Sequence, residues 1–286
     1  MITLKPFVKW AGGKSQLLDP INHLIEKCPH SNRYSEPFLG GGAVYLSQLE
    51  KQSFQFCYLN DVNYPLIRMY QAFRDYPNTT LVDYLSDLEA QYNVIDALDK
   101  KEKLYYAHRD TYNSLDTGVY KTALFIFLNK AGFNGLYREN KRGQLNVPFG
   151  KRKTVSLCNL DHVKLFSELT SKTKSLFTVG DFSRCGIPIT SESVVYLDPP
   201  YEKLNEASFV SYSSQRYRLE NLVSFIQLIC HKKAYFILSN SDTPKVRETF
   251  KDFNIIEVGA SRNINSDGEG RKKITELLIT NIGGTK

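Results

Sequence analysis

An acidic residue, two prolines and an aromatic residue stand directly after a short apolar run. The run covers Val194–Leu197, and the next four residues are Asp198, Pro199, Pro200 and Tyr201. Such a run is typical of a buried strand, and open α/β sheets bind ligands beyond the carboxyl ends of their strands. The prolines stiffen the backbone, so a carbonyl oxygen there becomes a fixed acceptor beside the carboxylate. With a tyrosine ring to stack on, these groups could hold a planar molecule that bears an amino group, although a turn with an exposed acid is the alternative.

A glycine cluster precedes a second acidic residue. Residues Glu36–Gly42 have the sequence EPFLGGG, and Asp61 lies about 20 residues further on, after the β-rich run Phe54–Leu59. Glycines after a first strand let a ligand approach the backbone, and an acid at the end of a second strand suits ribose hydroxyls. The cluster lacks the third glycine of the dinucleotide pattern. It indicates a nucleoside-containing cofactor, with a plain tight turn as the alternative.

The third candidate motif, KWAGGKS, lies near the start of the chain. Its last part, Gly13, Lys14 and Ser15, resembles the end of a phosphate-binding P-loop, but that motif requires a glycine where Val8 stands. The pattern therefore excludes a P-loop nucleotide hydrolase. Trp10, the single tryptophan of the chain, either contacts a ligand or packs in the core.

The elements that must position these motifs alternate between strands and helices. Short apolar or β-rich runs predict five strands, at Phe54–Leu59, Leu176–Val179, Val194–Leu197, Tyr235–Leu238 and Leu277–Ile279. Apolar residues at helical spacing predict one helical face, formed by Leu219, Leu222, Val223, Ile226 and Ile229. This alternation predicts an α/β sheet covered by helices. Residues 64–159 differ, with long helical stretches and then a Gly- and Asn-rich basic stretch, and they are expected to form an inserted domain.

The composition is that of a folded protein with an uneven positive charge. The 286 residues include 37 Lys+Arg and 30 Asp+Glu, giving +7, and 42% are hydrophobic, which excludes global disorder. Between residues 138 and 153 a single acid, Glu139, faces six basic residues, which are Arg138, Lys141, Arg142, Lys151, Arg152 and Lys153. This stretch is either a solvated loop or a surface that binds a polyanion.

Several function classes are excluded by what the sequence lacks. The five cysteines are scattered without a CxxC pair or a histidine at ligand spacing, so we expect reduced thiols and no metal site. No window approaches the roughly 18 apolar residues of a membrane helix, and lysines interrupt the first residues, unlike a signal peptide. We therefore expect a soluble cytoplasmic protein.

The motifs, taken in order, resemble the S-adenosylmethionine-dependent DNA adenine-N6 methyltransferases of the Dam type, named for methylation of adenine in GATC. The resemblance spans nearly the whole chain, through FVKWAGGK, EPFLGGG, NKAGFNGLYREN, NVPFGKRK, VVYLDPPY, LSNSDT and RKKITELL. The motif order is that of the family's α group. The resemblance implies a Rossmann-like methyltransferase sheet from residues 1–63 and 160–286, with a mainly helical target-recognition domain at 64–159.

The resemblance also implies roles for individual residues. Asp198, Pro199 and Tyr201 would act in catalysis on an adenine flipped out of the duplex, with Asp198 and the Pro199 carbonyl accepting the hydrogens of its amine and Tyr201 stacking on its ring. The residues implied in binding S-adenosylmethionine are Trp10, Lys14, Phe38, Gly40, Asp61, Asp181, Phe182 and Asp198. Asp61 would hold the ribose hydroxyls, and no metal is needed.

The family pattern assigns target recognition to residues of the inserted domain together with one lysine near the start of the chain. These residues are Lys9, Phe133, Asn134, Leu136, Arg138, Asn146 and Pro148. Arg138 and Lys9 can donate to guanine edges, and Leu136 and Pro148 can pack on a thymine methyl group. Phe133 stands where the family often has a tyrosine, so stacking remains but a hydroxyl contact is lost.

The resemblance therefore predicts a site-specific adenine methyltransferase, bacterial or phage-encoded, that acts on double-stranded GATC. It is expected in the cytoplasm, associated with the nucleoid through DNA binding. No obligate protein partner is evident, and a restriction nuclease acting on the same site is the one partner considered. The alternatives are a restriction–modification enzyme with another target, a methyltransferase of RNA or glutamine, and a DNA-binding protein that lost catalysis.

Overall fold

The fold is described from a computed structural model that covers residues 3–75, 80–200, 218–261 and 273–283. The chain divides into two compact units. The helical unit comprises residues 1–13, 40–46 and 63–172, and the sheet unit comprises residues 14–39, 47–62 and 173–286. The functional division between residues 64–159 and the rest of the chain stays a prediction.

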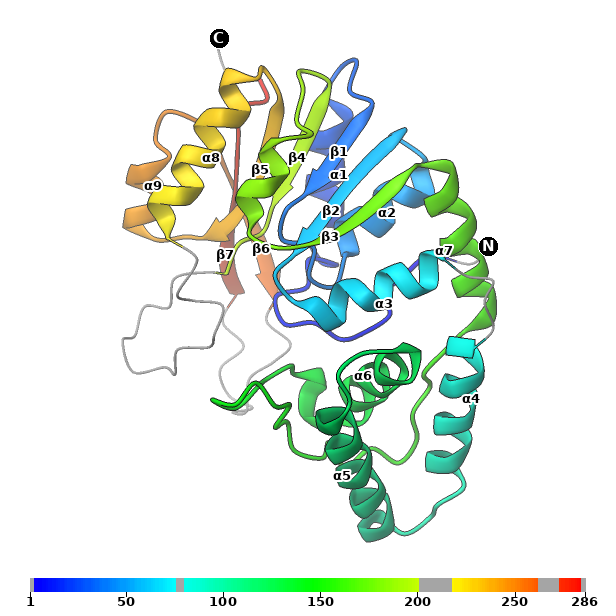
Figure 1. The fold of residues 1–286 in the computed structure, drawn as a ribbon. Coiled ribbons are helices and arrows are strands. Elements are labelled where there is room, and N and C mark those ends of the chain that lie inside the picture. The colour runs from blue at the N-terminus through cyan, green and yellow to red at the C-terminus, as the bar shows by residue number, and fades with distance from the viewer. Residues whose placement is uncertain (1–2, 76–79, 201–217, 262–272, 284–286) are drawn as a thin grey trace. The chain divides into compact units, whose positions relative to one another are not determined.

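The sheet unit is built on one seven-stranded sheet (Figure 1). Its strands are β1 (Arg33–Glu36), β2 (Phe56–Asp61), β3 (Ser175–Val179), β4 (Ser193–Leu197), β5 (Tyr235–Ser241), β6 (Asn254–Ser261) and β7 (Lys273–Thr280). They follow the order β3-β2-β1-β4-β5-β7-β6, and β7 alone runs antiparallel to its neighbours. The strand order reverses between β1 and β4, which is the switch point where open α/β sheets bind ligands. The predicted Rossmann-like α/β fold is confirmed.

The central strands are apolar because both of their faces are covered. Every residue of β4 is buried, as expected for a parallel strand between layers. Helix α8 (Leu219–His231) packs on one face against β5 (Figure 1). It buries Leu222, Ile226 and Ile229, spaced three to four residues apart, and each such side chain contributes about 1.5–3 kcal/mol.

Three further helices lie wholly or partly in the sheet unit, namely α1 (Leu18–Glu26), α2 (Ala43–Lys51) and α9 (Pro244–Thr249). The Asn22 carboxamide on α1 hydrogen-bonds Ser47 and Gln48 on α2, which ties these two helices together.

The five predicted strands and the predicted helix are all confirmed, with ends that differ by a few residues. The sequence did not reveal the bounds of two strands. The sequence of β1 is RYSE, which carries no apolar run, and its pairing with β2 and β4 makes it a strand. Strand β6 lies at the edge of the sheet and includes Glu257 and Gly259, which break the apolar pattern.

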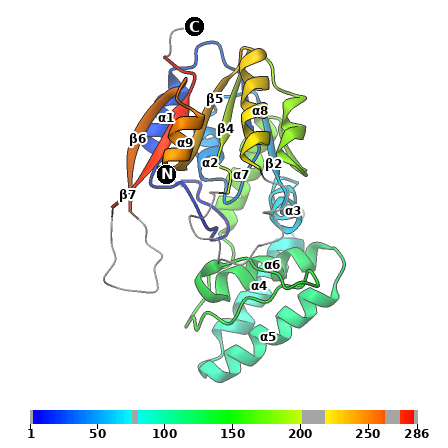
Figure 2. The same ribbon diagram turned by 90° about the vertical axis from the view of Figure 1, so that its left-hand side faces the viewer.

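The helical unit is organised around one buried helix. Its elements are α3 (Tyr64–Arg74), α4 (Thr80–Asn93), α5 (Leu98–Ser114), α6 (Val119–Ala131), a short 3-10 turn (Phe133–Gly135) and α7 (Leu160–Lys172). Helix α6 is buried continuously from Thr122 to Asn129 and contacts α3, α4 and α5 (Figure 2). A helix that is apolar all round belongs in a core.

An aromatic cluster ties the start of the chain to α3 and α7. The ring of Phe7 stacks on Phe73 with centroids 4.3 Å apart and meets Phe166 edge-on at 5.0 Å. The imidazole of His162 lies 4.7 Å from the Phe7 ring, and its Nε2 accepts the Lys5 backbone N–H at 2.9 Å. His162 therefore serves as an acceptor in its neutral form.

This neutral histidine makes stability depend on pH. Burial, and then the charges of Lys130 and Lys5, lower the pKa of His162 from its usual value near 6.5. A proton consequently binds more readily to the unfolded chain, so the free energy of unfolding falls as the pH drops below about 6.5. We expect His162→Gln to lose less melting temperature than the wild type between pH 7.5 and pH 5. Equal losses in thermal melts of the two proteins would contradict this role.

Candidate functional site

Several predicted site residues stand at the carboxyl ends of the parallel strands, which form one edge of the sheet. Asp61 is the last residue of β2, Asp198 follows β4, and Asp181 lies two residues after the end of β3. Phe38 lies two residues after β1 ends at Glu36. The sheet unit thus places four of the predicted residues at the edge where its topology predicts a ligand.

Asp198 is held by an ion pair with Lys14. The Lys14 Nζ atom lies 2.8 Å from Asp198 Oδ1 and 4.0 Å from Glu276 Oε2, on β7. The lysine side chain is 6% exposed and that of Asp198 is 20% exposed. An ammonium group at this distance stabilises the ionised carboxylate. The adjacent Pro199 is buried and Pro200 is exposed. The chain therefore passes from the core to the surface at these two prolines, whose rings restrict the backbone.

Asn60 is a residue of this edge that the sequence did not reveal. Its side chain is 1% exposed, and its Nδ2 donates to the carbonyls of Pro37 at 3.1 Å and Gly180 at 2.9 Å. The Thr178 hydroxyl donates to Asn60 Oδ1 at 3.0 Å, and the Gly180 N–H donates to the Asp61 carbonyl at 3.1 Å. Asn60 therefore joins the loops after β1 and β3 to the end of β2. Its only sequence signal is an asparagine at the end of an otherwise buried strand.

Aromatic rings and a capping acid follow β1 and β3. The rings of Phe38 and Phe182 lie 5.0 Å apart at 30°, and Phe225 meets Phe182 edge-on. The Asp181 carboxylate caps the turn Phe182–Gly186 by accepting the Ser183 N–H at 3.0 Å. The carboxylate of Glu36, another residue absent from the predicted set, accepts the Tyr34 hydroxyl at 2.8 Å. This edge can offer a planar group both an aromatic surface and carboxylate acceptors.

Tyr201 lies outside the described residues. Within the described ranges, no group of three or more His, Cys, Asp or Glu side chains could hold a metal ion. The five cysteines are free thiols, and burial raises the pKa of Cys57 and of Cys185 to about 12. These two thiols are protonated at neutral pH and are poor nucleophiles.

Trp10 and Gly40 belong to the helical unit. The indole of Trp10 stacks on Tyr137 with centroids 5.9 Å apart at 26°. Gly40 has φ +50°, and a Cβ atom there would lie 3.1 Å from Trp10 Cδ1. A side chain at Gly40 would therefore both strain the backbone and crowd the indole.

The predicted DNA-contacting residues all lie in the helical unit, in a region with little regular secondary structure. Lys9, Phe133, Asn134, Leu136, Arg138 and Pro148 are exposed, and Asn146 is half-buried. The Arg138 guanidinium donates to Asn146 Oδ1 at 2.8 Å and to the Asn146 carbonyl at 3.1 Å. An isolated antiparallel bridge pairs Glu139 with Leu145, so residues 138–146 form a short hairpin. The basic residues at its tip are Lys141 and Arg142.

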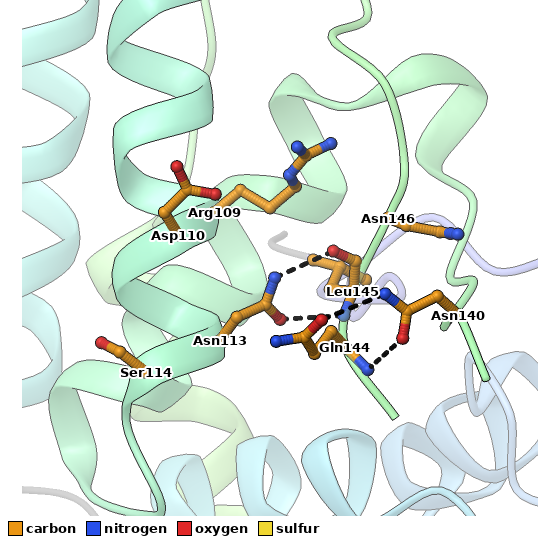
Figure 3. A pocket seen from close by; sticks show the side chains of 8 residues that line it. All are labelled: Arg109, Asp110, Asn113, Ser114, Asn140, Gln144, Leu145 and Asn146. Atoms are coloured by element: carbon orange, nitrogen blue, oxygen red, sulfur yellow. Dashed lines mark hydrogen bonds between the residues drawn. The ribbon is translucent and has the colours of Figure 1, made fainter. Parts of the chain in front are cut away.

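Side chains of α5 hold this hairpin, next to a polar cavity of about 330 Å³ (Figure 3). The Asn113 carboxamide accepts the Leu145 N–H at 2.8 Å and donates to the Leu145 carbonyl at 3.0 Å. Asn140 closes the tip by accepting from the N–H groups of Arg142 and Gln144. Side chains therefore supply hydrogen-bond partners for these backbone N–H and C=O groups of the hairpin.

Positive charges crowd one another in the helical unit. Partial burial and the charge of Arg152 lower the pKa of Lys9, and burial followed by the charge of Lys9 lowers the pKa of Lys130. Cations that depress one another's pKa favour a bound anion. Burial, reinforced by Tyr112 and Glu139, raises the pKa of Tyr137, so this ring stays neutral beside Trp10.

Among the described residues, no helix combines the length and the apolar character needed to cross a bilayer.

Comparison with known proteins assigns the family. The family model of the D12 class N6 adenine-specific DNA methyltransferases matches residues 10–264. The type II methyltransferase M.MjaIII of Methanocaldococcus jannaschii is 37% identical over 97% of this chain and 99% of its own length. M1.LlaDCHI of Lactococcus lactis subsp. cremoris is 32% identical over 99% of this chain and 97% of its own length. The DNA adenine methylase of Escherichia coli K12 is 30% identical over 96% of this chain and 94% of its own length. The chain belongs to the D12 class of N6 adenine-specific DNA methyltransferases.

Proposed function

We propose that this enzyme transfers a methyl group from S-adenosylmethionine to the N6 amine of a flipped-out adenine in double-stranded GATC. The observation that carries the proposal is the Asp198 carboxylate, held 2.8 Å from a buried lysine directly after β4. The relatives named DNA adenine methylase, from Vibrio cholerae and Escherichia coli among others, support the choice of adenine in DNA.

The residues of the sheet unit fit S-adenosylmethionine in their chemistry. Asp61 ends β2, where an acid suits ribose hydroxyls. The aromatic surface of the tilted pair Phe38 and Phe182 suits an adenine ring, and the carboxylate of Asp181 suits its amino group. We propose that these residues bind the methyl donor together with Lys14 and Asp198. The cofactor-binding roles that the family resemblance implies for Trp10 and Gly40 stay predictions.

The chemistry assigned to Asp198 and Pro199 is the activation of a weak nucleophile. The lone pair of an adenine amine is delocalised into the ring. When the Asp198 carboxylate and the Pro199 carbonyl accept its two hydrogens, the nitrogen can become pyramidal and direct its lone pair outward. S-adenosylmethionine, when bound, supplies a methyl group on a positively charged sulfur. The protein contributes position and fixed acceptors, without a covalent enzyme intermediate.

The amine lies inside the duplex, so the base must leave the stack before it reacts. Tyr201 is proposed to stack on the flipped base. We propose that Phe133 and Asn134, which are exposed in the helical unit, contact the duplex where the base is lost. The repulsion of Lys9 by Arg152 and of Lys130 by Lys9 supports binding to a polyanion. We propose that the enzyme works on the DNA of the cytoplasmic nucleoid.

A second candidate is a modification enzyme of a restriction system with a target other than GATC. Two relatives more than 30% identical to this chain, M.MjaIII and M1.LlaDCHI, carry the name type II methyltransferase. A cognate nuclease would then be the partner that acts on the same site. The chemistry at Asp198 would be the same, and only the bases contacted would differ.

Methyl transfer to defined duplexes tests the proposal. The purified enzyme is incubated with labelled S-adenosylmethionine and a duplex that carries one GATC, and the digested nucleosides are separated. We expect label in N6-methyladenine, and none with a matched duplex in which that site reads GTTC. Label in adenine of another sequence would favour the second candidate. If neither duplex is labelled, and RNA or protein offered in place of the duplex is labelled, both candidates are overturned.

A further inference from the structure

Asn129 lies in the last turn of α6, where its side chain is only 4% exposed. Its Oδ1 accepts the backbone N–H of Lys9 at 2.9 Å. Its Nδ2 donates to the carbonyl of Lys9 at 2.8 Å and to the carbonyl of Gly135 at 2.9 Å. One buried carboxamide thus holds both backbone groups of Lys9 and joins them to the turn Phe133–Gly135.

The two segments that Asn129 joins are in close contact. Gly135 has φ +64°, and a Cβ atom there would lie 2.3 Å from Lys9 Cβ. The preceding residue, Asn134, also has a left-handed backbone, with φ +53°. Only a glycine lets the turn approach the lysine stem this closely. The position of the Lys9 side chain is therefore defined relative to Asn134.

Neither segment has regular structure of its own to fix it. Residues 3–13 form no helix or strand, and the turn after α6 is three residues long. Helix α6, by contrast, is buried from Thr122 to Asn129 and packs against three other helices. A side chain on this helix is a rigid support for two loops.

We infer that Asn129 is a positioning residue for target recognition, because it holds Lys9 and the turn 133–135 as one surface against the DNA. The inference rests on the proposed function, which assigns Lys9, Phe133 and Asn134 to the DNA interface. Trp10 follows Lys9 and stacks on Tyr137 at 5.9 Å, so the same bonds also restrain the indole. Loss of the carboxamide would let the two loops move independently, and this would lower discrimination between DNA sites.

A matched control exists in the same unit. Asn93 makes the same pair of backbone bonds to one residue, accepting the Val155 N–H and donating to the Val155 carbonyl, both at 2.9 Å. Val155 lies outside the predicted interface. Asn93→Ala and Asn129→Ala each remove a carboxamide from a helix of the same unit, so a general loss of stability should affect both proteins alike.

The first readout is the tryptophan itself. Trp10 is the only tryptophan of the chain, so intrinsic fluorescence reports on the segment that Asn129 holds. We expect Asn129→Ala to raise the acrylamide quenching constant of the folded protein, and Asn93→Ala to leave it unchanged. If Asn129→Ala does not fold, Asn129→Ser, which retains a hydroxyl, is measured below its melting temperature. If the quenching constant of the Asn129 variant equals that of Asn93→Ala, the inference is overturned.

The second readout is kcat/KM on GATC divided by kcat/KM on its single-base variants, with Lys9→Ala as reference. We expect Lys9→Ala and Asn129→Ala to lower this ratio at the same base pair by about five- to tenfold, and Asn93→Ala to leave it unchanged. If Lys9→Ala lowers the ratio and Asn129→Ala does not, the inference fails while the proposed interface stands. If Lys9→Ala leaves the ratio unchanged, the proposed role of Lys9 fails, and the inference with it.

Discussion

Asp198→Ala is expected to lower the rate of methyl transfer by at least about a hundredfold, and towards a thousandfold, because it removes a preorganised acceptor at the reacting amine. The loss should lie in kcat, since the role proposed for the carboxylate is to act on the nitrogen as its lone pair develops rather than on the affinity for the duplex. Single-turnover rates at saturating S-adenosylmethionine and DNA measure it directly.

A second ion pair of the sheet unit gives the control. Lys51 Nζ lies 2.8 Å from Glu26 Oε1, the same distance as between Lys14 Nζ and Asp198 Oδ1. Unlike the pair of Lys14 and Asp198, however, the side chains of Glu26 and Lys51 are both exposed. Glu26→Ala should keep the wild-type rate, because an exposed pair contributes little to stability and this one lies in α1 and α2. A rate for Asp198→Ala within tenfold of the wild type, in a protein with normal circular dichroism, would contradict the assigned role.

Arg138→Ala is expected to lower discrimination at one base pair of the target by about 1–3 kcal/mol, which corresponds to roughly 5- to 150-fold. The guanidinium is exposed and its plane is oriented by two hydrogen bonds to Asn146. A planar group fixed in this way suits bidentate donation to a guanine edge. The values of kcat/KM over all single-base variants of GATC identify the affected position.

Arg138→Lys separates base contact from phosphate contact. Lysine keeps the charge but not the planar pair of donors, so it should restore the salt dependence of binding while discrimination stays low. If Arg138 contacted only phosphate, both variants would weaken binding to all sequences alike and leave the discrimination profile unchanged. That outcome would remove Arg138 from the base-contacting set.

Much of the sheet could be predicted because its central strands are apolar on both faces. The β4 sequence SVVYL indicates a buried strand by itself, and the position of Asp198 at the sheet edge follows from it. Strand β1 could not be located, because the residues RYSE owe their burial to the strands on either side. Strand β6, at the edge of the sheet, has a weaker apolar pattern because, among the described residues, it pairs only with β7.

The same limit applies to the candidate site. Motifs indicated the residues that would touch ligands, such as Asp61 and Arg138. They assigned no role to the asparagines that hold nearby backbone, although Asn129 is the first residue of the motif NKAGFNGLYREN. Asn60 and Asn129 are buried, and their importance lies in carbonyl and N–H groups that are distant along the chain. A hydrogen bond between distant segments leaves no periodicity or spacing in the sequence.

The pairing of Arg138 with Asn146 is a further example. From the resemblance to the family, both residues were predicted to contact DNA. The structure shows that they bond to each other across a short hairpin, so one residue orients the other.

The most direct test of the central claim is methylation-aware sequencing of DNA from a methylase-free bacterial host that expresses this chain, with Asp198→Ala in parallel. We expect N6-methyladenine at GATC sites throughout the genome with the wild-type protein, and none with the variant at equal expression. Methyladenine confined to another sequence would contradict the proposed target. Unmodified DNA from cells that contain the folded wild-type protein would contradict the proposed reaction on DNA.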